Sequence, residues 1–156
     1  MGYYHNATIC LNGHVLSSYD ANGQPYCEKC GAGTISNCTY CNKPIHGDYE
    51  VPGVVAIGFK YYKPYYCWNC GKPYPWTEKI LENAIEILSL DETIGETERE
   101  LIKNAIPNLI VETPDTPVAV AKYKKGISQA AEFVKASMRQ LLIDVVSETI
   151  KKTLFQ

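Results

Sequence analysis

The segment CLNGHVLSSYDANGQPYCEKCG, residues 10–31, holds three cysteines and one histidine, and it decides how the N-terminal part of the chain can fold. The whole chain has seven cysteines. Disulfide bonds would leave one thiol over, and two tetrahedral sites built only from cysteine would lack one ligand. His14 is therefore a candidate for the eighth metal ligand.

Three cysteine pairs share the spacing CxxC, and each is followed by a residue type that tolerates a positive φ. The pairs are Cys27/Cys30, Cys38/Cys41 and Cys67/Cys70, and the residues after them are Gly31, Asn42 and Gly71. Two thiolates at positions i and i+3 can bind one tetrahedral ion if the backbone forms a tight turn. Such a turn often needs a residue in the left-handed region just after the second cysteine. The threefold repeat predicts metal-binding knuckles rather than a redox motif.

A fourth half-site is needed, and Cys10-x3-His14 supplies it, with Asn12-Gly13 as its turn. The ligand count then closes at eight, which predicts two four-coordinate metal ions. Sulfur-rich sites that include a histidine favour Zn²⁺ over an iron site, so we expect two zinc ions per chain. His5 and His46 are alternative ligands, and we interpret both as surface residues because the spacing of His14 completes the pattern.

The spacing leaves open which half-sites share an ion. In the sequential pairing, Cys10, His14, Cys27 and Cys30 bind one ion, and Cys38, Cys41, Cys67 and Cys70 bind the other. We favour this pairing because its intervals suit a zinc ribbon, in which hairpin strands bring two knuckles together. In the main rival, the two middle pairs share an ion and the first half-site joins the last. An interleaved pairing is a third arrangement.

Composition divides the chain into two parts, residues 1–76 and 77–156. The first part carries all the cysteines and histidines, and the second has no cysteine and many charged residues. Residues 54–57 and 59–62 are rich in β-branched and aromatic types, which predicts strands. The tyrosines of this part are expected mainly to cover the metal sites. The predicted fold class is α+β: a small β-rich double zinc-ribbon head followed by about three helices.

The second part has helical periodicity throughout. We expect helices from PWTEKILENAIEILSL and GETERELIKNAI, then one long helix that begins at Thr116-Pro117 and runs nearly to the C-terminus, with Gly126 as a candidate break. Its apolar seam consists of Ile127, Ala131, Val134, Met138, Leu141 and Val145. This spacing is typical of a coiled-coil face, so residues 127–154 are expected to bind a protein partner or a second copy of the chain.

Several motifs of the chain resemble a bacterial zinc-ribbon family of unknown function. In the first part these motifs are CLNGH, YCEKCG, CTYCNKPIHG, VPGVVAIG and YYCWNCGKPYPWTE, and in the second part they are TPVAVAKYKKGI and IDVVSETIKKTLF. The resemblance covers nearly the whole chain and implies no activity. It implies the same eight metal positions as the spacing does.

Charge and motif content favour a non-enzymatic role. The formal charge is −2, and two Zn²⁺ ions with seven thiolates bring it to about −5. Residues 1–76 contain no arginine, so nucleic-acid binding is the alternative rather than the favoured function.

Eight ligands would close both metal sites, and no nucleophile or phosphate-loop motif is present. We expect a cytoplasmic accessory or adaptor protein that has no membrane partner, because no secretory signal or membrane-length apolar run is seen.

Overall fold

The computed structural model describes residues 1–156. The chain forms two compact units, Met1–Lys79 and Ile80–Gln156, which we call the N-terminal unit and the helical unit. The boundary lies inside helix α1 (Pro75–Ser89), whereas composition placed it after residue 76. None of the helices is long and apolar enough to cross a membrane.

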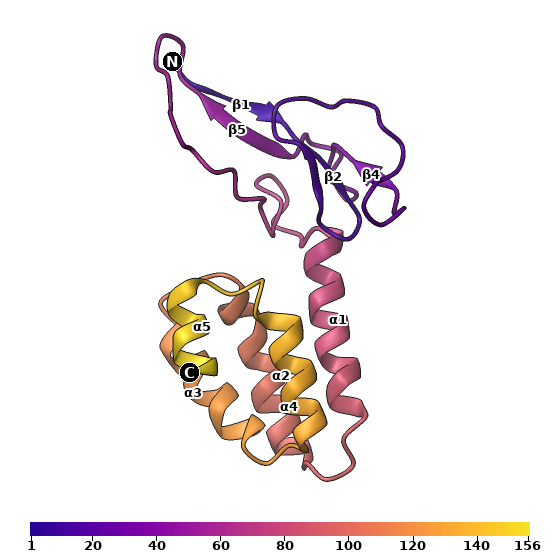
Figure 1. Ribbon diagram of the computed structural model, residues 1–156, viewed down its shortest axis with the longest axis vertical. Helices are drawn as coiled ribbons and strands as arrows, with labels where there is room; N and C mark the ends of the chain where they lie inside the picture. Colours follow the sequence, from indigo (N-terminus) through magenta and orange to yellow (C-terminus); the bar gives the residue numbers. More distant parts are fainter. The chain divides into compact units, whose positions relative to one another are not determined.

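The N-terminal unit contains two small antiparallel sheets (Figure 1). Strand β1 (Tyr3–Asn6) pairs with β5 (His46–Glu50), and strand β2 (Thr8–Cys10) lies between β3 (Val15–Ser17) and β4 (Thr34–Ile35). The β1–β5 ribbon passes close to the end of β3. A Cβ atom at Gly47 would lie 2.0 Å from the carbonyl oxygen of Ser18, so only glycine fits at this crossing.

The core of the N-terminal unit is small and includes metal-ligand candidates. Its largest buried members are Ile9, Ile45, Tyr74 and Trp76, and Cys38 and Cys67 pack in the same cluster. The indole of Trp76 donates a hydrogen bond to the carbonyl of Pro64 at 2.9 Å. A core of this size stabilises a fold only weakly, so cross-links of some kind are expected to contribute.

The strands predicted at residues 54–57 and 59–62 do not form. The chain from 51 to 60 has turns but no strand, and most of its side chains are exposed. Gly53 has φ +84° and Gly58 has φ +76°, so both bend the backbone where an extended strand would need negative φ. The prediction was wrong because it was based on residue type alone. A strand also needs a pairing partner, and no neighbouring strand pairs with this segment.

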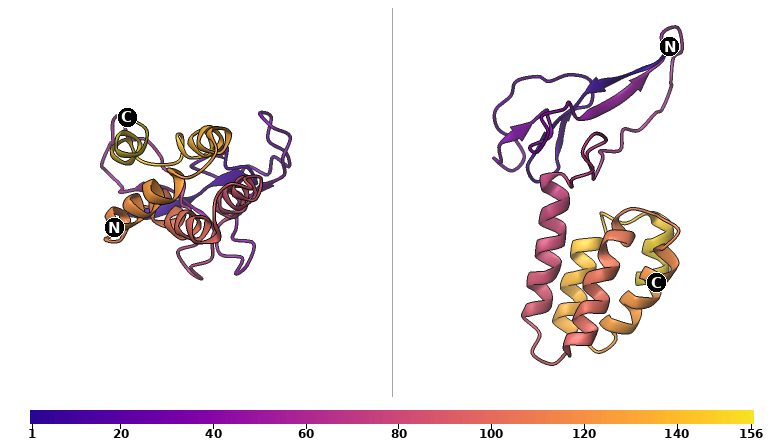
Figure 2. Two further views of the ribbon diagram at one scale, coloured as in Figure 1. Left: turned by 90° about the horizontal axis from the view of Figure 1, so that it is seen from below. Right: turned by 180° about the vertical axis from the view of Figure 1, so that it is seen from behind.

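The helical unit consists of the remainder of α1 and four further helices, which surround one apolar core (Figure 2). These are α2 (Glu96–Ile110), α3 (Thr116–Ile127), α4 (Glu132–Leu142) and α5 (Glu148–Phe155). Helices α2 and α3 approach closely at Gly126, where a Cβ atom would lie 2.6 Å from Cγ1 of Ile102. Glycine at this position therefore permits the close packing of two helices.

The single long C-terminal helix predicted from residue 116 is instead three helices, so the fold has five helices rather than about three. The first interruption follows Ile127, one residue after the candidate break at Gly126. There the carboxylate of Asp91 accepts a hydrogen bond at 2.7 Å from the backbone of Ala131, which has extended dihedral angles. At the second, Ser147 is an N-cap whose hydroxyl accepts the backbone N–H of Ile150. These contacts stabilise two new helix starts.

The breaks change the role of the apolar seam. Val134, Met138 and Leu142 are fully buried within the helical unit. Leu141 and Val145, from the predicted coiled-coil register, are only half-buried. Much of the seam is therefore core of the monomer, and only the outer surfaces of residues 127–154 are free to meet another protein.

Candidate metal centre

The three CxxC pairs adopt the same backbone turn. In each, the N–H of the first cysteine donates to the carbonyl five residues later, and the N–H four residues later donates back to the carbonyl of that cysteine. The first bonds join Cys27 to Ala32, Cys38 to Lys43 and Cys67 to Lys72, and the return bonds come from Gly31, Asn42 and Gly71. These last three residues have φ values of +73°, +61° and +74°. The sequence expectation of left-handed residues at these positions is confirmed.

The fourth half-site is a different turn, at the β2–β3 hairpin. The N–H of Cys10 donates to the carbonyl of His14 at 2.9 Å, and the N–H of Gly13 donates to the carbonyl of Cys10 at 2.9 Å. Gly13 has φ +93°, so a glycine is favoured there. The hairpin places the Cys10 thiol and the His14 ring on the same side.

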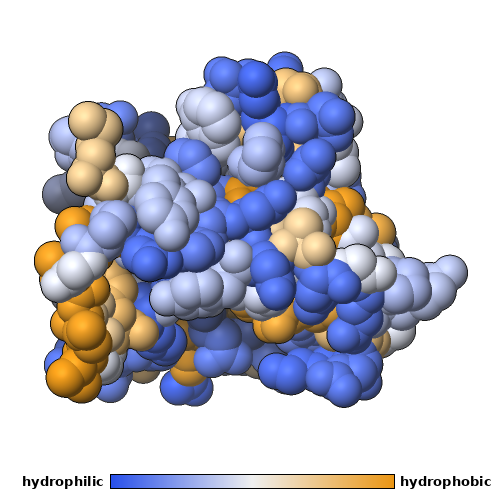
Figure 3. Space-filling model, turned by 90° about the horizontal axis from the view of Figure 1, so that it is seen from above, coloured by the Kyte–Doolittle hydropathy of each residue, from blue (hydrophilic) through white to orange (hydrophobic).

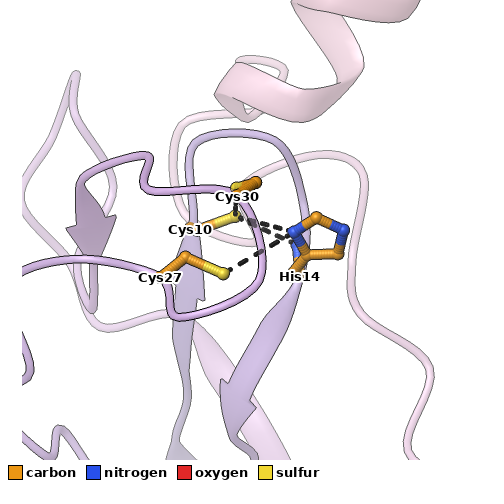
Figure 4. Close-up of side chains that lie close together, drawn as sticks. All are labelled: Cys10, His14, Cys27 and Cys30. Atoms are coloured by element: carbon orange, nitrogen blue, oxygen red, sulfur yellow. Dashed lines mark hydrogen bonds between the residues drawn. The ribbon is translucent and has the colours of Figure 1, made fainter.

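The structure brings Cys10, His14, Cys27 and Cys30 together, with all four ligand atoms within 4.8 Å of one another (Figure 4). Nδ1 of His14 faces the sulfurs and lies 3.5 Å from Sγ of Cys10 and 3.7 Å from Sγ of Cys27. The sulfurs of Cys10 and Cys30 are 3.7 Å apart. We call these four residues the histidine group.

The structure also brings Cys38, Cys41, Cys67 and Cys70 together, within the same 4.8 Å limit. The sulfurs of Cys38 and Cys70 are 3.7 Å apart, and those of Cys41 and Cys67 are 3.6 Å apart. We call these residues the four-cysteine group. The two groups correspond to the sequential pairing, and neither rival pairing is seen.

The spacing of the donors fits tetrahedral metal coordination. With Zn–S bonds of about 2.3 Å and Zn–N bonds of about 2.0–2.1 Å, a tetrahedron places its sulfurs about 3.8 Å apart and its sulfur and nitrogen about 3.6 Å apart. The distances in both groups lie close to these values. A disulfide would need sulfurs about 2.05 Å apart, and all seven cysteines are free thiols. Each group could therefore hold one metal ion.

Backbone and side-chain N–H groups surround the sulfurs. The N–H of Tyr40 donates to Sγ of Cys38 and the N–H of Asn69 donates to Sγ of Cys67, both at 3.4 Å. In the histidine group the side-chain amide of Asn12 donates to Sγ of Cys30 at 3.4 Å. Donors in these positions stabilise thiolate charge, which is the ionisation state that binds metal.

The same contacts shift the thiol pKa values. In the histidine group, the N–H of Ala32 and the amide of Asn12 lower the pKa of Cys30 to about 6. In the four-cysteine group, burial raises the pKa of Cys67, but backbone N–H groups and the neighbouring thiols outweigh this effect and lower it to about 6. One thiol in each group is thus readily ionised near neutral pH.

The other thiols hold their protons more tightly. Burial raises the pKa of Cys10. The N–H of Lys72 lowers the pKa of Cys70, but burial and the adjacent thiols together raise it to about 11. The thiols in each group therefore compete for protons, and a divalent cation is the species that would let all of them ionise together.

A buried tyrosine hydroxyl next to the four-cysteine group supports the same fit. The hydroxyl of Tyr74 is buried and has no hydrogen-bond partner. Its pKa is raised by burial and then by the charge and proximity of Cys67, Cys38 and Cys41. Those sulfurs are its polar neighbours, so a metal-bound thiolate there would give the hydroxyl an acceptor.

Lysines lie beside the histidine group. The ammonium of Lys63 is half-buried, which lowers its pKa, whereas the charge of Cys10 raises it. Nζ of Lys79 donates to the side-chain oxygen of Asn12 at 2.6 Å. Three thiolates, a neutral histidine and a divalent cation carry a net charge of −1, which these lysines partly offset. Sequence reasoning named Asn12 only as part of a turn and did not connect Lys63 or Tyr74 with the metal groups, and their only signal was nearness to the motifs.

The other two histidines lie outside both groups. His5 Nε2 contacts the carboxylate of Glu50 at 2.5 Å. His46 is stacked between two aromatic rings, with centroids 3.9 Å from Tyr4 and 4.8 Å from Trp68. Neither histidine is placed to bind a metal with the cysteines.

Two small sheets that carry two groups of four Cys/His donors, followed by a helical unit, define a small α+β protein of the zinc-ribbon-like class with two candidate metal centres. A family model, "Uncharacterized protein conserved in bacteria (DUF2321)", matches residues 3–154. The chain therefore belongs to this family, as the resemblance of its motifs indicated. No curated protein and no solved structure matches the chain.

Proposed function

We propose that each donor group holds one Zn²⁺ ion in a structural, non-catalytic role. Four soft donors per ion, including a histidine in one group, favour zinc over harder cations. The observation that carries the proposal is that each group already supplies four protein ligands. A tetrahedral ion then has no position for a water or substrate, which catalytic zinc sites keep open.

The ions would supply folding energy to the N-terminal unit. Its buried apolar cluster is small, and two of its members are the ligands Cys38 and Cys67. Structural zinc commonly contributes stability that a core of this size lacks. Chelation is then expected to unfold the N-terminal unit and to affect the helical unit less.

The stabilised chain would act as an accessory or adaptor protein through its helical unit. A cleft of about 400 Å³ lies among α3, α4 and α5, within the region that the sequence suggested for partner binding. Its walls include Ile127 and Leu154, and Arg139 lies 5.9 Å from the ring centre of Phe155. The lining also contains the Lys135–Glu132 ion pair, so Arg139 is its charge without an acidic partner. Such a cleft suits a partner segment that has aliphatic residues and an acidic residue.

Two measurements test this proposal. Replacement of zinc by Co²⁺ should give the absorption spectrum of tetrahedral thiolate coordination, and azide should leave the spectrum unchanged; a response to azide would indicate an open coordination position and contradict the structural role. For the partner role, proteins retained by the wild-type chain should be lost with Arg139→Glu plus Leu154→Glu. They should be retained with Val118→Glu, an exposed site on α3 outside the cleft. Equal recovery with both variants would reject the cleft as the docking site.

Nucleic-acid binding remains the second candidate, and one observation favours it. Tyr4, His46 and Trp68 form a continuous parallel stack, and Tyr4 and Trp68 are each about half exposed. Bases can stack on such rings. The negative charge and the absence of arginine from the N-terminal unit oppose it. A mobility shift with single-stranded DNA at low salt tests the idea, and no retention at micromolar protein would dismiss it.

A further inference from the structure

The segment of residues 51–59 is the most exposed apolar part of the N-terminal unit. It reads VPGVVAIGF and carries no charge. Its exposed side chains are Val54 at 64%, Val55 at 84%, Ile57 at 93% and Phe59 at 81%. Hydrophobic residues gather at the left edge of the space-filling view in Figure 3. A cluster of this kind is rarely left in water without a binding role.

The exposure is built into the local sequence. Gly53 and Gly58 bracket the four residues Val54–Ile57, and both have positive φ with open space around the position of a Cβ atom. The two bends keep the apolar side chains away from the core. Both ends of the segment are fixed: β5 ends at Glu50, and the hydroxyl of Tyr61 donates to the carbonyl of His46 at 2.6 Å.

The base of the segment is aromatic. Tyr4 and Tyr49 are paired across the β1–β5 ribbon and are about half exposed, and Tyr3 pairs with Glu50, the residue just before the segment. Figure 1 shows the chain leaving β5 beside the N-terminus and turning back along this end of the ribbon. Tyrosine rings with a polar tip are suited to the boundary between an apolar phase and water.

Charge around the segment is positive on its C-terminal side. Lys60 follows it, and no acidic residue occurs between Val51 and Thr77, whereas Lys63 is half-buried beside the histidine group. The nearest acid, Glu50, contacts His5. An uncharged apolar tip with tyrosines and Lys60 at its base is the pattern of an element that enters a lipid headgroup region. A protein-docking patch more often includes polar side chains that form hydrogen bonds.

We propose that residues 51–59 insert into the interfacial region of a phospholipid membrane. Insertion is shallow, because the segment's unpaired backbone groups must stay within reach of water or headgroups. This binding is peripheral and needs no membrane-spanning helix. It departs from the expectation of no membrane partner, which rested on the absence of a long apolar run, and it does not depend on the proposed adaptor role.

The test uses the full-length, zinc-loaded chain and vesicles of phosphatidylcholine with phosphatidylglycerol. The wild-type chain should sediment with these vesicles. Val55→Asp plus Ile57→Asp should weaken partitioning by at least about tenfold, because two exposed aliphatic side chains no longer leave water. Val118→Asp plus Ile85→Asp, on exposed helical positions, is the matched control and should bind as the wild type does.

Two further readouts make the outcome decisive. Zinc content and thermal unfolding of the Val55/Ile57 variant should match the wild type because both side chains are exposed; the milder Ile57→Ser replaces it if they do not. In the Phe59→Trp variant, the fluorescence of the new indole should be quenched by lipids brominated near the headgroup. No sedimentation of the wild-type chain, or equal sedimentation of the segment variant, would overturn the proposal, and an effect on protein capture alone would assign the segment to a protein partner.

Discussion

The role of His14 can be tested by removing it while the rest of its group is kept. His14→Ala deletes one of four donors and leaves three thiols, two of which lay within 3.7 Å of the lost nitrogen. Changes even in groups that only support a ligand cost about 10–100-fold in metal affinity, so loss of a ligand itself should cost at least about 100-fold. The four-cysteine group shares none of its donors with His14 and should keep its ion.

The assay is zinc content after dialysis against a moderate chelator, followed by titration with a chromogenic chelator to obtain the two affinities. The wild-type chain should retain two ions, and His14→Ala should retain about one. The matched control is His46→Ala, which loses aromatic stacking of about 0.5–1.5 kcal/mol but no donor, and it should retain both ions. If His14→Ala kept two ions with unchanged affinities, the histidine would not be a ligand and the reasoning from spacing would be refuted.

Three further predictions concern other parts of the chain. Tyr74→Phe should weaken zinc binding by the four-cysteine group about 10–100-fold in chelator competition, whereas Tyr123→Phe, in the helical unit, should not change it. The pKa of Asp91 is lowered by the hydroxyl of Thr93 and then by the N–H of Ala131. The ionised carboxylate therefore stabilises the fold fully above the unfolded pKa of about 3.9, and this stabilisation is lost as the pH falls through the lower folded pKa. The difference in melting temperature between the wild type and Asp91→Asn, followed by circular dichroism, should shrink below about pH 4. Met138→Ala removes a fully buried side chain and should lower the unfolding free energy of the helical unit by about 2–5 kcal/mol in urea titration, and a loss below 0.5 kcal/mol would show that this position is not core.

The eight candidate ligands could be identified from the sequence because metal knuckles are local. Two cysteines three positions apart, with a glycine or asparagine after the second, specify a turn with little help from the rest of the fold. The choice between pairings is a long-range property. It depends on the β2–β3 hairpin and on β4, which pairs with β2 and so brings the Cys27 knuckle to the Cys10 turn.

The errors have equally specific causes. Residues 54–62 have the composition of strands, but a strand needs a pairing partner, and the bends at Gly53 and Gly58 direct this segment into the solvent. The long helix ends just after Gly126, the candidate break, but the new start at Ala131 depends on a bond from its N–H to Asp91, forty positions away, and no local pattern contains that contact. The break before α5 was different: Ser147 followed by Glu148 is a local N-cap signal that the continuous apolar stripe obscured.

X-ray absorption at the zinc edge tests the central claim most directly, because it counts donors around the metal in the intact chain. Two closed sites predict two zinc ions per chain that together have seven sulfur neighbours at about 2.3 Å and one nitrogen at about 2.0 Å. An oxygen neighbour that exchanges with solvent, or fewer sulfurs than the donor groups supply, would contradict two closed structural zinc sites.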